Sequence, residues 1–233
     1  MLEPPEPRSY PCGMRSESPK HLAHGEESAK WDTAGVLLAL APDAPVDFAA
    51  MFGNDRPVEI EIGTGKAAFL LARAAARPEL NFLGIEWAGA YARYAADRFR
   101  RHGLLNVRML HGDATQFIRK CVADESVWRV HIYFPDPWPK RKHHGRRSIQ
   151  APFVDEIRRA LKPGGQLIIV TDHLEYFHHI RRVLAAAKGF ARVSFPQMAD
   201  REGELVGTNF ERKYIAQGRP FYSTALMKYA TSP

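Results

Sequence analysis

Residues Val58–Ala67 read VEIEIGTGKA, and the fold follows from this stretch. The alternation of apolar and acidic residues over Val58–Ile62 predicts a β-strand. Gly63 and Gly65 follow at once, and glycine lets the backbone turn sharply and approach a ligand closely. A helix that starts behind such a turn points its free amide groups toward the ligand. The stretch therefore predicts a strand, a ligand-binding turn and a helix in succession.

The same succession repeats along the chain. Short apolar segments that predict strands alternate with longer segments that predict helices. The predicted strands are residues 58–62, 81–86, 106–110, 129–134, 166–171, 190–195 and 221–228, and the predicted helices are 67–76, 89–102, 114–122, 150–161 and 174–188. This order predicts an α/β, Rossmann-like fold with a mostly parallel seven-stranded sheet and helices on both faces. Ligands of such sheets bind beyond the carboxyl ends of the strands.

Composition indicates the domain organisation. Residues 1–30 are rich in proline, serine and charged side chains, so we expect a disordered tail there and a single domain over residues 31–233. No apolar run approaches the ~20 residues of a membrane span, and the N-terminus lacks the order of a signal peptide. We therefore expect a cytoplasmic protein with no membrane partner and no obligatory protein partner. Cys12, His21 and His24 fit no usual zinc spacing, so no metal is expected.

Three acids indicate the kind of cofactor. Glu86 ends a predicted strand 21 residues after Gly65 (86 − 65), and an acid ~20 residues beyond such a turn typically binds ribose hydroxyls. Asp113 ends the next predicted strand, where it either contacts an adenine edge or caps the following helix, or does both. Glu61, inside the first strand, needs a cationic or hydrogen-bond-donating partner if it is buried. Acids around the pocket favour S-adenosylmethionine over NAD, whose pyrophosphate is anionic.

The segment FPDPWPKRKHHGRR, residues 134–147, follows the fourth predicted strand. Pro135 and Pro137 fix the backbone φ on both sides of Asp136. Its carboxylate is therefore oriented by a segment that loses little backbone conformational entropy when a ligand binds. Such a carboxylate can hydrogen-bond the edge of a guanine. Trp138 either stacks on a base or anchors the loop to the core.

A run of cations completes this segment. It contains Lys140, Arg141, Lys142, Arg146 and Arg147, in a chain of formal net charge +7. Such a run is either a solvated face or a binding site for the phosphates of a nucleic acid. Its position beside Asp136 favours phosphate binding.

Two later segments end near the same edge of the predicted sheet. Asp172 follows the predicted strand 166–171, and it either positions a substrate or caps the helix that follows. Residues 207–212 read GTNFER and are predicted to be a loop. Their small, polar and acidic residues suit a loop that returns over the site, although a plain connector has the same composition.

Together these motifs resemble the bacterial tRNA (guanine-N7)-methyltransferase family, from about Phe52 to Lys228. The resemblance is carried by EIGTGKA (61–67), FLGIE (82–86), HGDA (111–114), FPDPWPKRKHHGRR (134–147), TDH (171–173) and TNFER (208–212). It implies a class I fold that transfers a methyl group from S-adenosylmethionine to N7 of guanosine 46 in the tRNA variable loop. One departure is Ala67, where the family usually has glycine; its methyl group either crowds the cofactor or is accommodated by a small shift.

The resemblance also implies roles for individual residues. The cofactor-binding residues it implies are Glu61, Gly63, Gly65, Glu86, Asp113 and Asp136, and Asp136 is also the expected catalytic residue. The implied substrate-binding residues are Lys140, Asp172, Thr208, Asn209, Phe210 and Glu211, with Arg141, Lys142, Arg146 and Arg147 on the tRNA backbone.

Three other functions remain open at this point. The sequence DPW resembles the proline-bearing tips of enzymes that methylate exocyclic amino groups. A non-catalytic RNA-binding protein on the same scaffold would keep the cations but would not need the four acids. A nicotinamide-dependent oxidoreductase is disfavoured because Ala67 and the residues after it do not complete a GxGxxG motif.

Overall fold

The computed structural model describes residues 31–39, 45–199 and 201–229. The predicted tail, residues 1–30, lies outside the described residues. Within the described ranges, no helix has both the length and the apolar character needed to cross a membrane.

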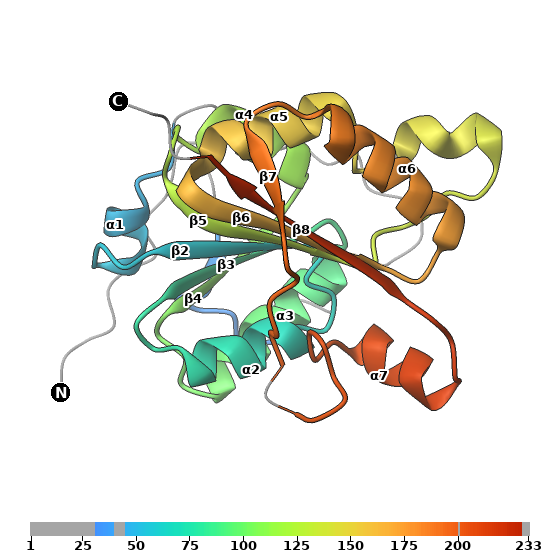
Figure 1. Ribbon diagram of the computed structural model, residues 1–233. Coiled ribbons are helices and arrows are strands. Elements are labelled where there is room, and N and C mark those ends of the chain that lie inside the picture. Colours follow the sequence, from blue (N-terminus) through green and yellow to red (C-terminus); the bar gives the residue numbers. More distant parts are fainter. Residues whose placement is uncertain (1–30, 40–44, 200, 230–233) are drawn as a thin grey trace, which may run out of the picture.

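A single mixed sheet forms the centre of the protein (Figure 1). Its order is β1-β4-β3-β2-β5-β6-β8-β7, with β8 antiparallel to both neighbours and the other pairs parallel. The strands are β1 (Leu37–Leu38), β2 (Val58–Ile62), β3 (Asn81–Glu86), β4 (Val107–His111), β5 (Val127–Tyr133), β6 (Leu161–Thr171), β7 (Phe190–Val193) and β8 (Tyr222–Lys228). The predicted fold class is confirmed. The eighth strand in the described residues is β1, which has too few residues to show a periodic pattern.

Helices cover both faces of the sheet. Figure 1 shows α4, α5 and α6 over one face and α2 and α3 over the other, with α7 on the side of α2 and α3. The helices are α1 (Phe48–Phe52), α2 (Ala68–Ala76), α3 (Gly89–Arg101), α4 (Ala114–Cys121), the short 3₁₀ helix η2 (Arg141–Arg146), α5 (Ala151–Ala160), α6 (Leu174–Ala186) and α7 (Asn209–Ala216). This three-layer arrangement buries the apolar residues of the sheet on both sides.

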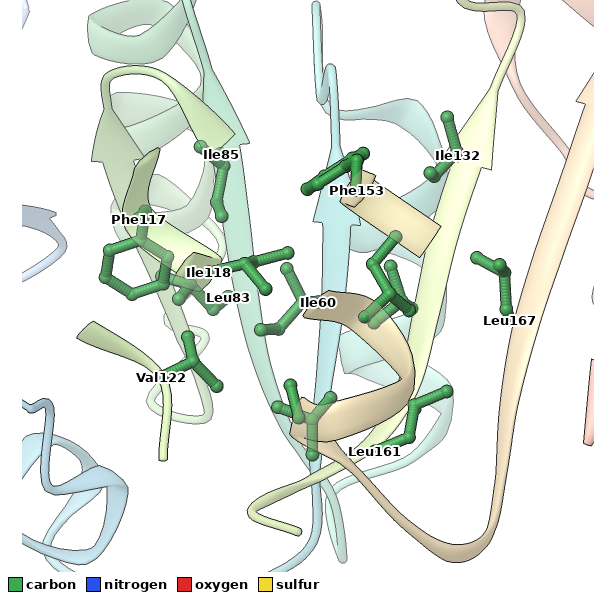
Figure 2. Close-up of a cluster of buried hydrophobic side chains, with 14 of the residues drawn as sticks. Ile60, Leu83, Ile85, Phe117, Ile118, Val122, Ile132, Phe153, Leu161 and Leu167 are labelled. Atoms are coloured by element: carbon green, nitrogen blue, oxygen red, sulfur yellow. The ribbon is translucent and has the colours of Figure 1, made fainter. Parts of the chain in front are cut away.

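The two faces of β2 have different surroundings. Ile60 points into the apolar layer under α4 and α5, where it packs with Leu83, Phe117 and Phe153 (Figure 2). Full burial of one such aliphatic side chain contributes about 1.5–3 kcal/mol. Because successive side chains of a strand point to opposite faces, Glu59 and Glu61 face the layer that contains α2.

The strand order reverses between β2 and β5, and ligands bind at such a reversal. From β2 the chain moves outward through β3 and β4, and it then returns to β5 on the other side of β2. Ligands of open α/β sheets bind beyond the carboxyl ends of strands at such a reversal. The Gly63–Gly65 turn follows β2 and the Pro135–Pro137 tip follows β5, so the reversal brings these two segments together.

One predicted strand begins too late. The predicted helix 150–161 does end before the stop signal Lys162–Gly165, because α5 ends at Ala160, but these four residues belong to β6, which begins at Leu161 and not at residue 166. A β-carbon on Gly165 would lie 2.8 Å from the Lys162 carbonyl oxygen and 3.0 Å from that of Trp128. The glycine therefore permits a close approach of β6 to β5, an interaction between distant segments that a local stop signal does not reveal.

Candidate active site

A cavity of about 620 Å³ lies beyond the ends of β2 and β5. Four segments far apart in sequence line it: the end of β2 with the turn and the start of α2, one face of α3, the end of β5, and the start of α7. The lining residues are Glu61, Gly63, Thr64, Gly65, Lys66, Ala68, Phe69, Tyr91, Tyr94, Arg98, Tyr133, Phe134, Thr208, Asn209, Phe210 and Lys213. This is the place at which the strand order predicts a ligand.

The glycine turn is held by the end of β3. Gly63 and Gly65 have φ angles of 79° and 53°, in the left-handed region that glycine enters without steric cost. The amide of Gly65 donates to Glu86 Oε2 at 2.8 Å, and the amide of Ala88 donates to Glu86 Oε1 at 2.9 Å. Each carboxylate oxygen has a second lone pair, so Glu86 can support the turn and still accept a ligand hydroxyl.

Glu61 is a buried carboxyl group on the cavity wall. Only 3% of the residue is exposed, and within the described ranges its Oε2 has no hydrogen-bond partner. Burial, and then the charge of Glu86, raise the pKa of Glu61 well above the usual carboxyl value. A buried acceptor without a donor is costly, and a cationic ligand with N–H groups would satisfy it. The site therefore fits a cofactor that carries an ammonium group.

Ala67 is strained but does not line the cavity. Its φ angle is 60°, a left-handed conformation that costs an L-residue with a β-carbon roughly 1–2 kcal/mol. The residue is fully buried in the apolar cluster that contains Leu70 and Phe82, and it is not among the cavity-lining residues. The departure from glycine therefore places backbone strain in the turn, and crowding of the cofactor by this methyl group stays one of two open alternatives.

Asp113 caps α4, as one of the two interpretations predicted. Its Oδ1 accepts from the amides of Thr115 at 2.7 Å and Gln116 at 3.2 Å. Next to it, the amide of Gly112 donates to the carbonyl oxygen of Glu86 at 3.0 Å. The cap thereby holds the end of β4 against the end of β3. A contact between Asp113 and adenine stays a prediction.

The Pro135–Pro137 tip begins at the cavity wall and presents an exposed Asp136. Phe134 and Trp138, on either side of the tip, have φ angles of 51° and 43°. Phe134 lines the cavity, and its ring centroid lies 6.1 Å from that of Phe210 on α7. Two left-handed residues that are not glycine are unfavourable, and such strain is concentrated at functional sites.

Trp138 packs on the basic segment rather than in the core. Its ring centroid is 5.9 Å from that of His143, and the guanidinium carbon of Arg146 lies 5.0 Å from the indole centroid. Neither apolar cluster includes Trp138. The interpretation that Trp138 anchors the loop to the core is therefore wrong, because the indole packs on η2 instead. Stacking of Trp138 on a base stays a prediction.

The cations of residues 140–147 divide into two groups. Lys140, Arg141, Lys142 and Arg146 are exposed. Arg147 is only 2% exposed: its Nε donates to the carbonyl oxygen of Pro137 at 2.9 Å, and its terminal nitrogens bind the carboxylate of Glu175 on α6. The prediction that Arg147 contacts the tRNA backbone is wrong, because all its nitrogens face protein groups. It ties the tip to α6 instead.

Asp172 does not cap α6. The cap is His173, whose Nδ1 accepts from the amide of Tyr176 at 3.3 Å. Asp172 instead pairs with Arg219 at 2.7 Å, and its side chain is 15% exposed. It directly follows β6, the neighbour of β5 in the sheet. The alternative role of Asp172, substrate positioning, stays a prediction.

The predicted loop 207–212 is wrong for most of its length, because Thr208 caps α7 and the helix begins at Asn209. Thr208 accepts from the amide of Glu211 at 3.0 Å, the first half of a Thr-x-x-Glu capping box, a sequence signal of a helix start. Glu211 is fully buried, and its carboxylate accepts from the amides of Leu205, Val206 and Gly207. A direct substrate contact by Glu211 is therefore also wrong. Its carboxylate shapes the segment that carries the exposed, cavity-lining Asn209 and Phe210.

Sequence reasoning missed several cavity residues. Tyr91, Tyr94 and Arg98 lie three and four positions apart on α3, so they share one face of the helix. That spacing is visible in the sequence and could have identified the face. Lys213 extends the cavity wall from α7, whereas Tyr133 is simply the last residue of β5.

Comparisons with known proteins show the family of this chain. The family described as "Putative methyltransferase" matches residues 55–224. A tRNA (guanine-N(7)-)-methyltransferase of Salmonella choleraesuis is 38% identical over 176 residues, which are 74% of this chain and 72% of the relative. One of Pseudomonas putida is 39% identical over 184 residues, which are 78% and 77% of the two chains. Residues 55–224, which the family model matches, contain the turn, the tip and the start of α7.

The fold alone is shared with more distant proteins. The crystal structure of a SAM-dependent methyltransferase from Aquifex aeolicus superposes with a TM-score of 0.51 at 16% identity, over 77% of this chain and 86% of that one. At this level of identity the similarity concerns the arrangement of strands and helices.

Proposed function

Because the chain belongs to the family of tRNA (guanine-N(7)-)-methyltransferases, we propose that it transfers a methyl group from S-adenosylmethionine to N7 of a guanosine in the variable loop of tRNA. The proposed acceptor is nucleotide 46. One observation carries the proposal: Phe134, which leads into the Asp136 tip, lines the same cavity as Glu61 and the Gly63–Gly65 turn. A cofactor held at the turn would then present its reactive group next to the tip.

The acids of the site supply the cofactor contacts in this proposal. Glu86, fixed by the amides of Gly65 and Ala88, accepts the ribose hydroxyls. Asp113 lies at the end of the adjoining strand and contacts the adenine. Glu61 meets the amino-acid end, because its buried oxygen needs an N–H donor. When bound, S-adenosylmethionine supplies an electrophilic methyl carbon on a sulfonium, and its transfer to N7 leaves S-adenosylhomocysteine.

Asp136 is proposed to orient the guanine. N7 has an in-plane lone pair and no proton, so the reaction needs no general base, and catalysis rests on alignment and electrostatics. The prolines on both sides limit the motion of the Asp136 backbone. Its exposed carboxylate accepts hydrogen bonds from the base edge and stabilises the positive charge that develops on the purine.

The substrate face surrounds the tip. Asn209, Phe210 and Thr208 line the cavity on the α7 side, and Asp172 lies on the β6 side, held by Arg219. Exposed Lys140, Arg141, Lys142 and Arg146 are proposed to bind the phosphates of the tRNA backbone. We leave Arg147 and Glu211 out of the direct contacts because both are buried.

A labelling experiment tests the function directly. The purified protein is incubated with an unmodified tRNA transcript and methyl-labelled S-adenosylmethionine, and the tRNA is digested to nucleosides. We expect labelled N7-methylguanosine, and no label in a transcript with adenosine at position 46. Labelled N6-methyladenosine would indicate the exocyclic-amine alternative. Tight tRNA binding without any cofactor binding would indicate a non-catalytic RNA-binding protein.

A further inference from the structure

A chain of buried polar groups runs beneath the cavity and ends at one of its wall residues. Glu59 on β2 is fully buried and binds Arg73 of α2 through two hydrogen bonds, at 2.9 and 3.0 Å, and Arg129 of β5 at 2.9 Å. Its Oε2 also lies 3.0 Å from Nε2 of His131. The other ring nitrogen of His131, Nδ1, is 2.8 Å from the hydroxyl of Tyr133, which lines the cavity.

The charges decide which groups carry protons. Burial alone would raise the pKa of Glu59, but the hydrogen bonds and charges of His131 and Arg73 outweigh it and hold this pKa far below the usual carboxyl value. Burial lowers the pKa of His131, although the Glu59 carboxylate opposes this effect. The chain therefore contains an ionised carboxylate and a neutral imidazole.

A neutral imidazole has a single N–H, so the tautomer follows from its partners. Nε2 faces the carboxylate of Glu59, which only accepts, and Nε2 must therefore carry the hydrogen. Nδ1 is then the acceptor, and the Tyr133 hydroxyl donates its hydrogen to it. Since this is the only hydrogen of the hydroxyl, the oxygen can only accept from any further partner.

The hydroxyl oxygen of Tyr133, which can accept a further hydrogen bond, lies close to Glu61. Glu61 is paired with His131 in the register of β2 and β5, on the same face as Tyr133. Burial, and then the charge of Glu61, raise the pKa of the Tyr133 hydroxyl well above its usual value. The ring of Phe69 packs at 4.9 Å from both His131 and Tyr133 and restricts their orientation. The Tyr133 oxygen, and the Glu61 carboxylate when it is ionised, thus offer two buried acceptors in one part of the cavity.

We propose that Tyr133 is a cofactor-binding residue that accepts a hydrogen bond from the α-ammonium group of the cofactor, and that His131 and Glu59 are positioning residues that keep its hydroxyl an acceptor. This inference rests on the proposed function, because it assumes S-adenosylmethionine as the ligand. A sulfonium has no N–H and cannot serve two acceptors, whereas an ammonium has three donors. Glu61 and Tyr133 would then satisfy two of the three.

The architecture favours this role over simple packing. A phenylalanine at 133 would fill the same space and would need no histidine beneath it. The network instead places three charged side chains and a neutral imidazole under the sheet surface, where unpaired polar groups are costly. The network thereby makes the Tyr133 hydroxyl the donor toward His131 and leaves its oxygen as an acceptor at the cavity wall.

Calorimetric binding of three ligands tests the inference. S-adenosylhomocysteine has both the ammonium and the carboxylate, decarboxylated S-adenosylhomocysteine keeps only the ammonium, and 5′-methylthioadenosine has neither. For Tyr133→Phe we expect about 10- to 100-fold weaker binding of the first two ligands, the loss of one hydrogen bond to a charged group. Binding of 5′-methylthioadenosine should be unchanged, which also shows that the variant is folded.

The control removes another tyrosine hydroxyl outside the cavity. Tyr222 stacks on Phe177 at 5.3 Å, and Tyr222→Phe should bind all three ligands as the unaltered protein does. Equally weakened binding of all three ligands by Tyr133→Phe would overturn the inference and indicate a packing role. Unchanged binding of all three ligands would overturn it as well.

If Tyr133→Phe does not fold, the unaltered protein provides the test. The inference is overturned if the unaltered protein binds decarboxylated S-adenosylhomocysteine no more tightly than 5′-methylthioadenosine. Failure of the unaltered protein to bind S-adenosylhomocysteine would instead refute the proposed function.

Discussion

The amide of Gly65 donates a hydrogen bond to the carboxylate of Glu86 at 2.8 Å. This contact joins the turn after β2 to the end of β3 and brings together two residues that are 21 positions apart in sequence. A single acid thus holds the glycine turn, and we propose that it also accepts the hydroxyls of the ribose. In this chain, the spacing between the glycine turn and the later acid therefore corresponds to a direct hydrogen bond between them.

Replacing Glu86 should weaken cofactor binding through both of these roles. In Glu86→Gln, one oxygen of the side chain becomes an NH₂ group, which cannot accept from Gly65 or Ala88. We expect a loss of about 1–3 kcal/mol in the binding of S-adenosylhomocysteine, the cost of an unsatisfied partner, measured by calorimetry. The matched control is Glu79→Gln, a change in an exposed carboxylate that pairs with Arg77. Equal affinities of the two variants would refute the assigned role of Glu86.

Asp136→Asn should separate binding from turnover. The amide keeps the shape of the tip but loses the negative charge that orients the guanine, so we expect single-turnover methylation to fall by about 10²-fold or more. Cofactor affinity should stay near that of the unaltered protein, because the carboxylate is exposed and has no role in the turn. Methylation at a near-normal rate in a single-turnover assay would remove Asp136 from the mechanism.

The exposed cations should contribute to the salt dependence of tRNA binding. Each phosphate contact releases counterions, so the double variant Arg141→Ala, Arg146→Ala should bind tRNA more weakly, with a log–log salt slope lower by roughly 1–2. Arg192→Ala provides the control, since Arg192 is exposed on the edge strand β7. An unchanged slope in the double variant would show that this run is merely a solvated face.

Arg147→Ala should behave differently from the exposed arginines. It removes the link from the Pro137 carbonyl to Glu175 and the packing on Tyr176, where the guanidinium carbon lies 4.9 Å from the ring centroid. We expect a loss of about 1–3 kcal/mol in the free energy of unfolding, read from urea denaturation. The salt slope of tRNA binding should stay as it is, and a lower slope without a loss of stability would contradict the buried role.

The buried Glu61 predicts a pH dependence with a defined sign. Its pKa in the folded protein is raised above the unfolded value, so between these two values the folded state holds the extra proton. The free energy of unfolding of the ligand-free protein should therefore fall as pH rises from the ordinary carboxyl pKa through the raised one. Glu61→Gln should lose this contribution. Denaturant titrations across that pH range measure it, and identical profiles for the two proteins would contradict the assignment.

Binding of the cofactor should show the opposite trend. An ionised Glu61 attracts an ammonium group and a protonated one does not, so affinity for S-adenosylhomocysteine should increase with pH over the same interval. Calorimetry in buffers of different ionisation enthalpy would detect the accompanying release of a proton. Affinity that is independent of pH would place the ammonium group away from Glu61.

The local signals in this chain are strong, and most of the fold could be predicted from them. VEIEI and RVHIYF are short and rich in β-branched residues, and the predicted strands at 58–62 and 81–86 agree with β2 and β3 residue for residue. The predictions failed where a distant contact decided the outcome, as at Gly165, or where a signal was overlooked, as in the Thr208–Glu211 capping box.

By itself, the sequence determined the order of strands and helices, the glycine turn, and the proline-bracketed acid next to a cationic run, because each depends on residues adjacent in the chain. Only the tertiary structure decided which polar side chains are available to a ligand. Arg147 and Glu211 have the residue types of binding groups, yet their burial commits both to protein partners. Tyr133 looked like an ordinary strand residue, yet the pairing of β2 with β5 places His131 and Glu59 behind it. Burial and partner geometry arise from segments far apart in sequence, so no local pattern contains them.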